Sequence, residues 1–206
     1  VGELVIAAAG GETLARQQGN PLLQESMSTI NQYVEQIREI ALRLRMVEIG
    51  DTLTRFHRLI RDTSKDLGKE IQLQINGAET ELDKTVVDKI ADPLTHLVRN
   101  ALDHGIETAE ERLAAGKPAK GVLCLNAYHE SGNVVIEVQD DGRGLNPERI
   151  RQKALEKGLL NANEQLDDQA LYQLIFAPGF STADSISNLS GRGVGMDVVK
   201  RSIDAL

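Results

Sequence analysis

The chain has 206 residues, of which 41% are hydrophobic and 26% charged, and this is an ordinary globular composition. Its formal net charge of -8 argues against a nucleic-acid-binding domain, which needs a basic face, but permits the binding of one nucleotide. The single cysteine, Cys124, cannot form an internal disulfide, and its apolar neighbours predict a small core residue in a reducing compartment. No apolar run is long enough to span a bilayer and no signal peptide is evident, so we expect a cytoplasmic protein without membrane insertion.

Helical periodicity dominates the first third of the chain. Residues 2–18 predict a first helix, which Gly10-Gly11 weakens and a following Gly-Asn-Pro run ends. Over residues 25–67 the apolar side chains recur with the alternating spacing of a helical seam, which shifts near Gly50, where we expect a kink or an irregular turn. Such an antiparallel hairpin needs a partner to cover its apolar stripe, which favours a four-helix bundle of two copies. Packing of both helices on the downstream region is the alternative.

The pattern becomes that of an α/β domain after residue 67. The expected elements are a strand at 71–75, a helix at 85–104, strands at 122–127 and 134–138, and helices at 147–157, 167–175 and 193–203. Pro93 predicts a kink in the first of these helices or marks its true start. Ser131-Gly132-Asn133 is a hairpin signal between the two later strands. The sequence therefore predicts an α+β protein with a helical domain at 1–67 and an α/β two-layer sandwich at 68–206.

The first polar cluster lies on the expected helix 85–104. His96, Asn100 and His104 are four residues apart, so a regular helix would place them on one face. A neutral carboxamide such as that of Asn100 can ligate Mg²⁺ through its oxygen without adding charge near phosphates. A solvated helix face is the alternative interpretation.

The second cluster is an Asp-Asp-Gly-Arg-Gly turn directly after a strand. Asp140 at this position can accept a hydrogen bond from an exocyclic amine such as that of adenine. Gly142 and Gly144 allow the backbone to pass close to a flat ligand. A simple Asp-Gly turn is the alternative.

The third cluster places alternate glycines, Gly191, Gly193 and Gly195, where a helix is expected to begin. Alternate glycines expose successive backbone N–H groups, and a helix N-terminus favours phosphate. The preceding segment is a polar loop and not a strand, which distinguishes the cluster from a dinucleotide-binding fingerprint. A Gly-Lys-Ser/Thr loop is missing, which excludes Walker-type ATPases.

In this order the three clusters resemble the N, G1 and G2 boxes of the GHKL (Bergerat-fold) ATPases. Three segments have sequences similar to those of the CheA-type chemotaxis histidine kinases: His96–Glu107, Phe176–Thr182 and Gly191–Val199. The resemblance covers nearly the whole chain. It implies a dimerisation domain at 1–67 and an ATP-binding catalytic domain at 68–206 that stops before the final strands of the family.

The resemblance also implies roles for individual residues. Asn100 would hold the Mg²⁺ that bridges the ATP phosphates, and Asp140 would recognise the adenine amine, with Gly142 and Gly144 shaping the pocket. Residues 176–190 would form a lid over the phosphates. The remaining nucleotide contacts would come from Asp103, Phe180, Ser181, Thr182, Gly191, Gly193, Val194, Gly195 and Met196.

The implied catalytic residues are His96, His104 and Arg149. His96 stands where the hydrolysing relatives carry a glutamate that acts as general base on water. A histidine there fits a kinase whose nucleophile is an imidazole, for which positioning and charge neutralisation supply most of the rate. His104 and Arg149 are expected near the phosphates.

The implied reaction transfers the γ-phosphoryl group of Mg-ATP to a histidine on a separate phosphotransfer domain of the same kinase. CheY-like response regulators would receive it next. The implied partners are a second copy of the chain and, through domains outside this sequence, a CheW-like adaptor and chemoreceptors in a receptor array.

Two departures from the family pattern lie in the helical region. Glu48 replaces a proline that usually follows Leu-Arg-Met-Val, and Gly10-Gly11 is unusual in the first helix. An orthodox sensor kinase would carry its acceptor on the dimerisation helix, where His57 is followed by Arg58 and not by an acidic residue. A gyrase- or chaperone-like ATPase is a further possibility, against which His96 argues. A degenerate dimerising scaffold is also possible, but the intact boxes argue against it.

Overall fold

The computed structural model describes residues 2–161, 166–180 and 195–206. The chain divides into two compact units: unit 1 comprises Val1–Val47 with Glu81–Lys84, and unit 2 comprises Glu48–Thr80 with Thr85–Leu206. The mixed α+β class predicted from the sequence is confirmed. None of the helices in the described part is long and apolar enough to cross a membrane.

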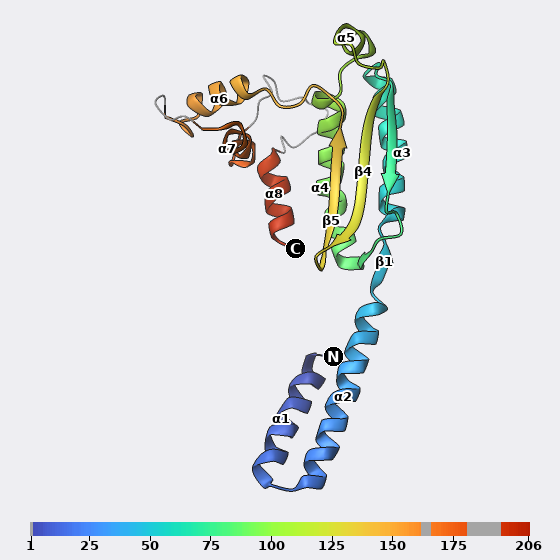
Figure 1. The fold of residues 1–206 in the computed structure, drawn as a ribbon, viewed down its shortest axis with the longest axis vertical. Coiled ribbons are helices and arrows are strands. Elements are labelled where there is room, and N and C mark those ends of the chain that lie inside the picture. Colours follow the sequence, from blue (N-terminus) through green and yellow to red (C-terminus); the bar gives the residue numbers. More distant parts are fainter. Residues whose placement is uncertain (1, 162–165, 181–194) are drawn as a thin grey trace. The chain divides into compact units, whose positions relative to one another are not determined.

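Unit 1 is built on an antiparallel helical hairpin. Helix α1 (Gly2–Gln18) and helix α2 (Pro21–Arg43) run side by side (Figure 1). Asn20 begins α2 as its N-cap, and its side chain accepts hydrogen bonds from the N–H groups of Leu22 at 3.0 Å and Leu23 at 3.3 Å. Pro21 at the first helical position has the backbone angle that a helix needs.

The glycine pair in α1 does not end the helix. The helix continues through Gly10 and Gly11, and a Cβ atom on Gly11 would overlap the side chain of Met27 on α2. A larger residue at position 11 would therefore require the flexible end of the Met27 side chain to move.

The helical seam expected over residues 25–67 is interrupted. Helix α2 ends at Arg43, strand β1 (Met46–Glu48) pairs with strand β3 (Glu81–Asp83), and helix α3 (Gly50–Asp66) begins afresh in unit 2. The irregularity predicted near Gly50 is therefore a strand followed by a new helix, and the compact units divide after Val47 and not at residue 67.

Unit 2 contains a three-stranded sheet in the order β2-β4-β5. Strand β2 (Ile71–Asn76) is parallel to β4 (Gly121–Glu130), which is antiparallel to β5 (Asn133–Asp140). The predicted hairpin is confirmed, because Ser131 and Gly132 both have the positive φ angles, 50° and 81°, of a two-residue turn.

Strand β4 alternates between a buried and a partly exposed face. Leu123 and Leu125 are fully buried, whereas Cys124 is only partly buried and its Sγ lies 3.2 Å from Oδ1 of Asn126. The core position expected for Cys124 was wrong, because adjacent strand residues point to opposite faces of the sheet.

Helices α3 and α4 (Lys84–Asn100) carry the other apolar faces of unit 2. Helix α3 lies beside β2 (Figure 1). Helix α4 begins well before Pro93 and continues through it, so Pro93 does not mark its start. A π turn, η1 (Ala101–Gly105), follows Asn100, and the N–H of Ile106 after it donates to the carbonyl of Ala101 at 2.8 Å. The buried side chains of the two helices include Leu53, Phe56, Ile60, Val87, Ile90, Leu94 and Val98.

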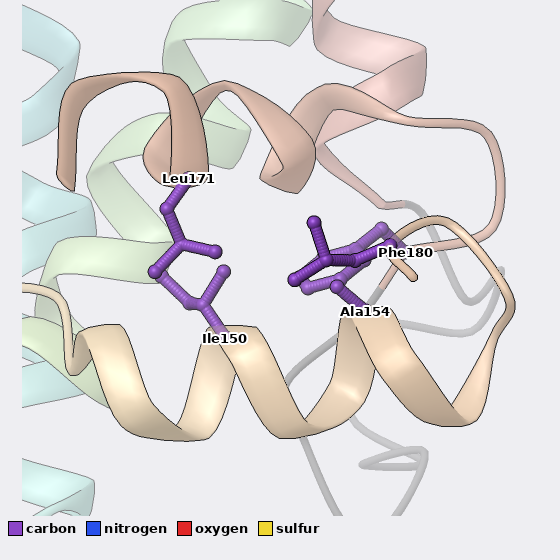
Figure 2. Packing of buried hydrophobic residues seen from close by; sticks show 5 residues of the cluster. Ile150, Ala154, Leu171 and Phe180 are labelled. Carbon is purple, nitrogen blue, oxygen red and sulfur yellow. The ribbon is translucent and has the colours of Figure 1, made fainter. Parts of the chain in front are cut away.

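In the described residues, three further helices and one 3-10 turn follow the sheet. Helix α6 (Pro147–Glu156), helix α7 (Asp168–Gln173), the 3-10 turn η2 (Leu174–Phe176) and helix α8 (Met196–Asp204) correspond to the expected helices. In Figure 2, Ile150 and Leu171 point toward each other, and Phe180 lies beside Ala154. The short helix α5 (Ala109–Ala114) was not predicted; Thr108 and Glu111 form a capping box at its start.

Candidate functional site

The end of helix α4 brings the first and third clusters together. Asn100 is the last residue of α4, and its Nδ2 lies 3.2 Å from Sδ of Met196, the first residue of α8. The two residues are distant in sequence, so only the tertiary fold makes them neighbours. This contact places the amide of Asn100 at the N-terminus of α8, where backbone N–H groups are available to an anion.

The predicted line of His96, Asn100 and His104 is only partly regular. His96 and Asn100 are half-buried, whereas His104 is exposed. His104 lies in the π turn η1, whereas His96 and Asn100 lie on α4. Helix bulges of this kind occur frequently at functional sites.

His96 has an environment that favours the neutral imidazole. Partial burial lowers its pKa below the ordinary value, and the positive charge of Arg99 lowers the pKa further. Both effects favour the neutral form of the imidazole.

The Asp140 turn contacts the end of the first cluster directly. Oδ1 of Asp140 accepts a hydrogen bond from the Gly142 N–H at 3.0 Å, and the Arg143 N–H donates to the Gly105 carbonyl at 2.9 Å. A Cβ atom on Gly142 would overlap this carbonyl group, and one on Gly105 would lie 3.0 Å from Oδ1 of Asp140. Glycine at 105 and 142 is thus what lets the two backbones meet beside a carboxylate.

Gly144 has a different reason to be glycine. Its φ angle is +69°, and open space surrounds the position of a Cβ atom. The backbone conformation and not crowding favours glycine here.

The third cluster is only partly within the described residues. Gly195 is the N-cap of α8 and Met196 its first residue, while Ser181, Thr182, Gly191, Gly193 and Val194, with most of the expected lid, lie outside the described residues. Phe180 is 3% exposed, and its ring packs in the cluster of Figure 2. Its carbonyl oxygen, and not its ring, lies near Gly195.

Asp103 and Arg149 are two further residues of the predicted site. Asp103 is part of the π turn, and its backbone carbonyl accepts a hydrogen bond from Nζ of Lys69 at 3.2 Å. The same Nζ donates to the carbonyl of Leu102 at 2.5 Å, so Lys69 satisfies two carbonyl groups at the end of the helix. Arg149 is exposed in the first turn of α6.

The structure adds charged residues that the sequence analysis did not assign. Arg112 and Lys117 donate hydrogen bonds to the Asp140–Gly142 turn, Arg112 to the carboxylate of Asp141 and Lys117 to the carbonyl of Gly142. Both cations also bind the carboxylate of Glu107. The sequence signal for these residues was a short run rich in Glu, Arg and Lys after the first cluster. A charged segment exposed to solvent has the same composition, so the run alone does not predict a buried ion pair.

The described residues contain no group of three or more His, Cys, Asp or Glu side chains that could hold a metal by themselves. This fits a metal held chiefly by phosphate oxygens, with Asn100 as one protein ligand. Because Nδ2 of Asn100 is directed at Met196, Oδ1 is the atom that would ligate.

His57 lies away from the motifs. It is exposed on α3 and lines a cavity of about 870 Å³ between α3 and β2, which none of the predicted site residues lines. His57 therefore belongs to unit 2 and not to the helical hairpin.

The fold and the site define a class: an α+β nucleotide-binding domain in which an Asn-bearing helix, an Asp-Gly turn and a helix N-terminus converge. The chain belongs to the family of histidine kinase-, DNA gyrase B-, and HSP90-like ATPases, whose model matches residues 89–206, more than half of the chain.

Known relatives make the resemblance more specific. The chain is 50% identical to the chemotaxis protein CheA of Bacillus subtilis over 99% of its length, and 47% identical to that of Salmonella typhimurium over 100%. It is 46% identical over 89% of its length to the sensor histidine kinase CheAY of Helicobacter pylori. The chain covers 31%, 31% and 23% of these proteins, so it spans at most about a third of their length. The resemblance to CheA-type kinases drawn from the motifs is confirmed.

Proposed function

We propose that this chain is the dimerisation and Mg-ATP-binding core of a chemotaxis histidine kinase. The contact of Asn100 with Met196 carries the proposal, because it joins a magnesium ligand to a helix N-terminus suited to phosphate. The joined backbones of Gly105 and Gly142 place the carboxylate of Asp140 in the same unit.

Each cluster binds a different part of the nucleotide. The carboxylate of Asp140 accepts a hydrogen bond from the exocyclic amine of adenine, and Gly142 and Gly144 leave room for the ring. The N-terminus of α8, which Gly195 caps, binds the phosphates. Oδ1 of Asn100 would hold Mg²⁺, which would neutralise phosphate charge during transfer.

The reaction is transfer to a histidine and not hydrolysis. A ring nitrogen of the acceptor imidazole forms a bond to the γ-phosphorus while the bond from that phosphorus to the β–γ bridging oxygen breaks. ADP leaves with the electron pair, and the other ring nitrogen releases its proton to water. His96 replaces the glutamate that would activate water, and its neutral imidazole, with the lowered pKa described above, can donate a hydrogen bond to a phosphate oxygen.

We place the acceptor histidine on a separate phosphotransfer domain of the same kinase. The position of His57 supports this choice over the orthodox arrangement, because α3 packs in unit 2 and not in the hairpin that would form the dimer. The phosphoryl group then passes to CheY-like response regulators. A CheW-like adaptor and chemoreceptors join through other domains in a cytoplasmic receptor array.

We assign dimerisation to the hairpin of unit 1. Ile30 and Ile37 on α2 are 45% and 51% exposed, and they lie two turns apart on one face. A second hairpin would cover this stripe in a four-helix bundle.

Calorimetric titration with Mg-ATP tests the nucleotide site. Asn100→Ala and Asp140→Ala should each weaken binding about 10- to 100-fold, the effect of losing one charge-assisted contact. Asn126→Ala on the partly exposed face of β4 and Asp62→Ala on α3 are matched controls and should bind like the wild type. Wild-type protein without saturable ATP binding would favour the scaffold alternative. Phosphorylation of His57 itself, in place of an added phosphotransfer domain, would favour the orthodox arrangement.

A further inference from the structure

Arg112 on α5 is a buried cation at the back of the Asp140 turn. The residue is 0% exposed, and its guanidinium binds the Asp141 carboxylate with both arms: Nη1 to Oδ1 at 3.0 Å and Nη2 to Oδ2 at 2.7 Å. Nε donates to the Pro118 carbonyl at 2.7 Å, and Nη1 lies 3.3 Å from Oε2 of Glu107. A guanidinium withdrawn from water needs such complete pairing, and a bidentate pair fixes direction as well as distance.

Lys117 holds the next residues of the same turn. Its Nζ donates to the backbone carbonyls of Asp141 at 3.1 Å and Gly142 at 2.7 Å, and to Oε1 of Glu107 at 2.8 Å. Two cations thus meet two carboxylates. The formal charges balance, so the group has no net charge to offer a ligand.

A chain of hydrogen bonds connects Lys117 to Asp140 through Gly142. Lys117 fixes the Gly142 carbonyl, and the N–H of the same glycine donates to Oδ1 of Asp140 at 3.0 Å. Asp141 is in turn tied to β4, because the Val122 N–H donates to its Oδ1 at 2.9 Å. Hydrogen bonds on the side of Arg112 and Lys117 therefore fix the orientation of the Asp140 carboxylate.

We infer that Arg112 and Lys117 are positioning residues that determine the selectivity of this site for a base with an exocyclic amine. The inference rests on the proposed function of Asp140. Neither residue touches the nucleotide. Both hold the turn so that one oxygen of Asp140 is occupied by Gly142 and the other meets the amine. Without the hydrogen bonds from Lys117, the turn lets the Asp140 carboxylate rotate. The site then loses its preference for a base with an amine, while the phosphate contacts remain.

Competition between ATP and ITP tests this inference in the intact protein. ITP carries a carbonyl oxygen in place of the amine, so a fixed carboxylate opposes it. Lys117→Met keeps the length of the side chain and removes its donors, and the side chain is 33% exposed, so folding should survive. We expect the ratio of ATP to ITP affinity to fall at least about fivefold, with a melting temperature near that of the wild type. Arg112→Lys should lower the same ratio, because a single ammonium cannot make the bidentate pair.

Arg58→Met removes an exposed cation of α3, paired with Asp62 at 3.7 Å, and serves as the matched control with an unchanged ratio. Lys117→Arg restores donors and should recover part of the selectivity. Equal weakening of ATP and ITP in Lys117→Met would overturn the inference and leave the proposed function standing. A wild type that binds ATP without preferring it to ITP would overturn the adenine role of Asp140 and the inference with it.

Discussion

The hairpin of unit 1 and the sheet-containing unit 2 differ in where their apolar side chains lie. All of α2 is described and none of its residues is buried; Leu22 is 73% exposed. Unit 2 buries Leu102, Leu123 and Leu125 completely. The difference shows that unit 2 has an apolar core of its own, whereas the large apolar side chains of α2 stay at least partly exposed.

The largest expected effect tests the buried charge of unit 2. Arg112→Met leaves the carboxylate of Asp141 without its bidentate partner and that of Glu107 with Lys117 alone, so we expect the free energy of unfolding to fall by about 3–5 kcal/mol. Arg58→Met breaks only the exposed pair with Asp62 and should cost less than about 1 kcal/mol. Urea denaturation of both variants measures the difference. Equal effects would show that burial of Arg112 has no special energetic weight.

A matched pair of leucines sharpens the contrast in apolar burial. Leu102→Ala creates a cavity in unit 2 and should lower the free energy of unfolding by about 2–5 kcal/mol. Leu22→Ala changes an exposed side chain of the hairpin and should stay within about 0.5 kcal/mol at protein concentrations too low for dimers. Thermal and urea denaturation follow both. A large loss for Leu22→Ala in the monomer would mean that the hairpin has a core of its own.

Dimerisation should respond to the hairpin stripe alone. Ile30→Ala and Ile37→Ala each remove apolar area from the expected bundle and should raise the dimer dissociation constant about tenfold. Analytical ultracentrifugation over a dilution series measures this constant. Gln32→Ala, an exposed polar position on the same helix, is the control. A dissociation constant unaffected by either isoleucine would assign the dimer to another surface.

The smallest expected effect is the response of unit 2 to acid. Burial alone would raise the pKa of Glu107, but the hydrogen bond from Lys117 and the charges of Lys117 and Arg112 outweigh it and lower the pKa. Burial also acts to raise the pKa of Asp141, but the hydrogen bonds from Arg112 and the Val122 N–H outweigh burial and lower that pKa as well.

Both carboxyl groups therefore bind protons more readily in the unfolded chain than in the folded one. Their stabilisation is complete above the unfolded values, about 4, and is lost as the pH falls through the lower folded values. Urea midpoints measured from pH 6 to pH 3 should fall, and the double variant Glu107→Gln with Asp141→Asn should flatten the decline. The dimer dissociation constant of the hairpin should be the same in this double variant as in the wild type.

Much of the site was predictable because its chemistry lies in short stretches of sequence. The order of Asn100, Asp140 and the glycines indicated a nucleotide-binding family, alternation marked β2, and the Ser131-Gly132-Asn133 turn signal marked the hairpin of β4 and β5. Cys124 was misplaced because a three-residue apolar run does not reveal which face of a strand is buried. Helix α3 lies in the compact unit of the sheet, and strand β1 separates it from α2, although the apolar periodicity of the sequence runs through both helices.

The sequence by itself determined the family, the nucleotide boxes and the helical character of the N-terminal region, because local periodicity and motif order are properties of the chain. Only the tertiary structure decided that Asn100 meets Met196, that His104 lies in a π turn, and that Arg112 is buried against the Asp140 turn. These are contacts between residues far apart in sequence or departures from regular helix geometry. Burial of a charge depends on which partners the fold brings to it, and no local pattern records that.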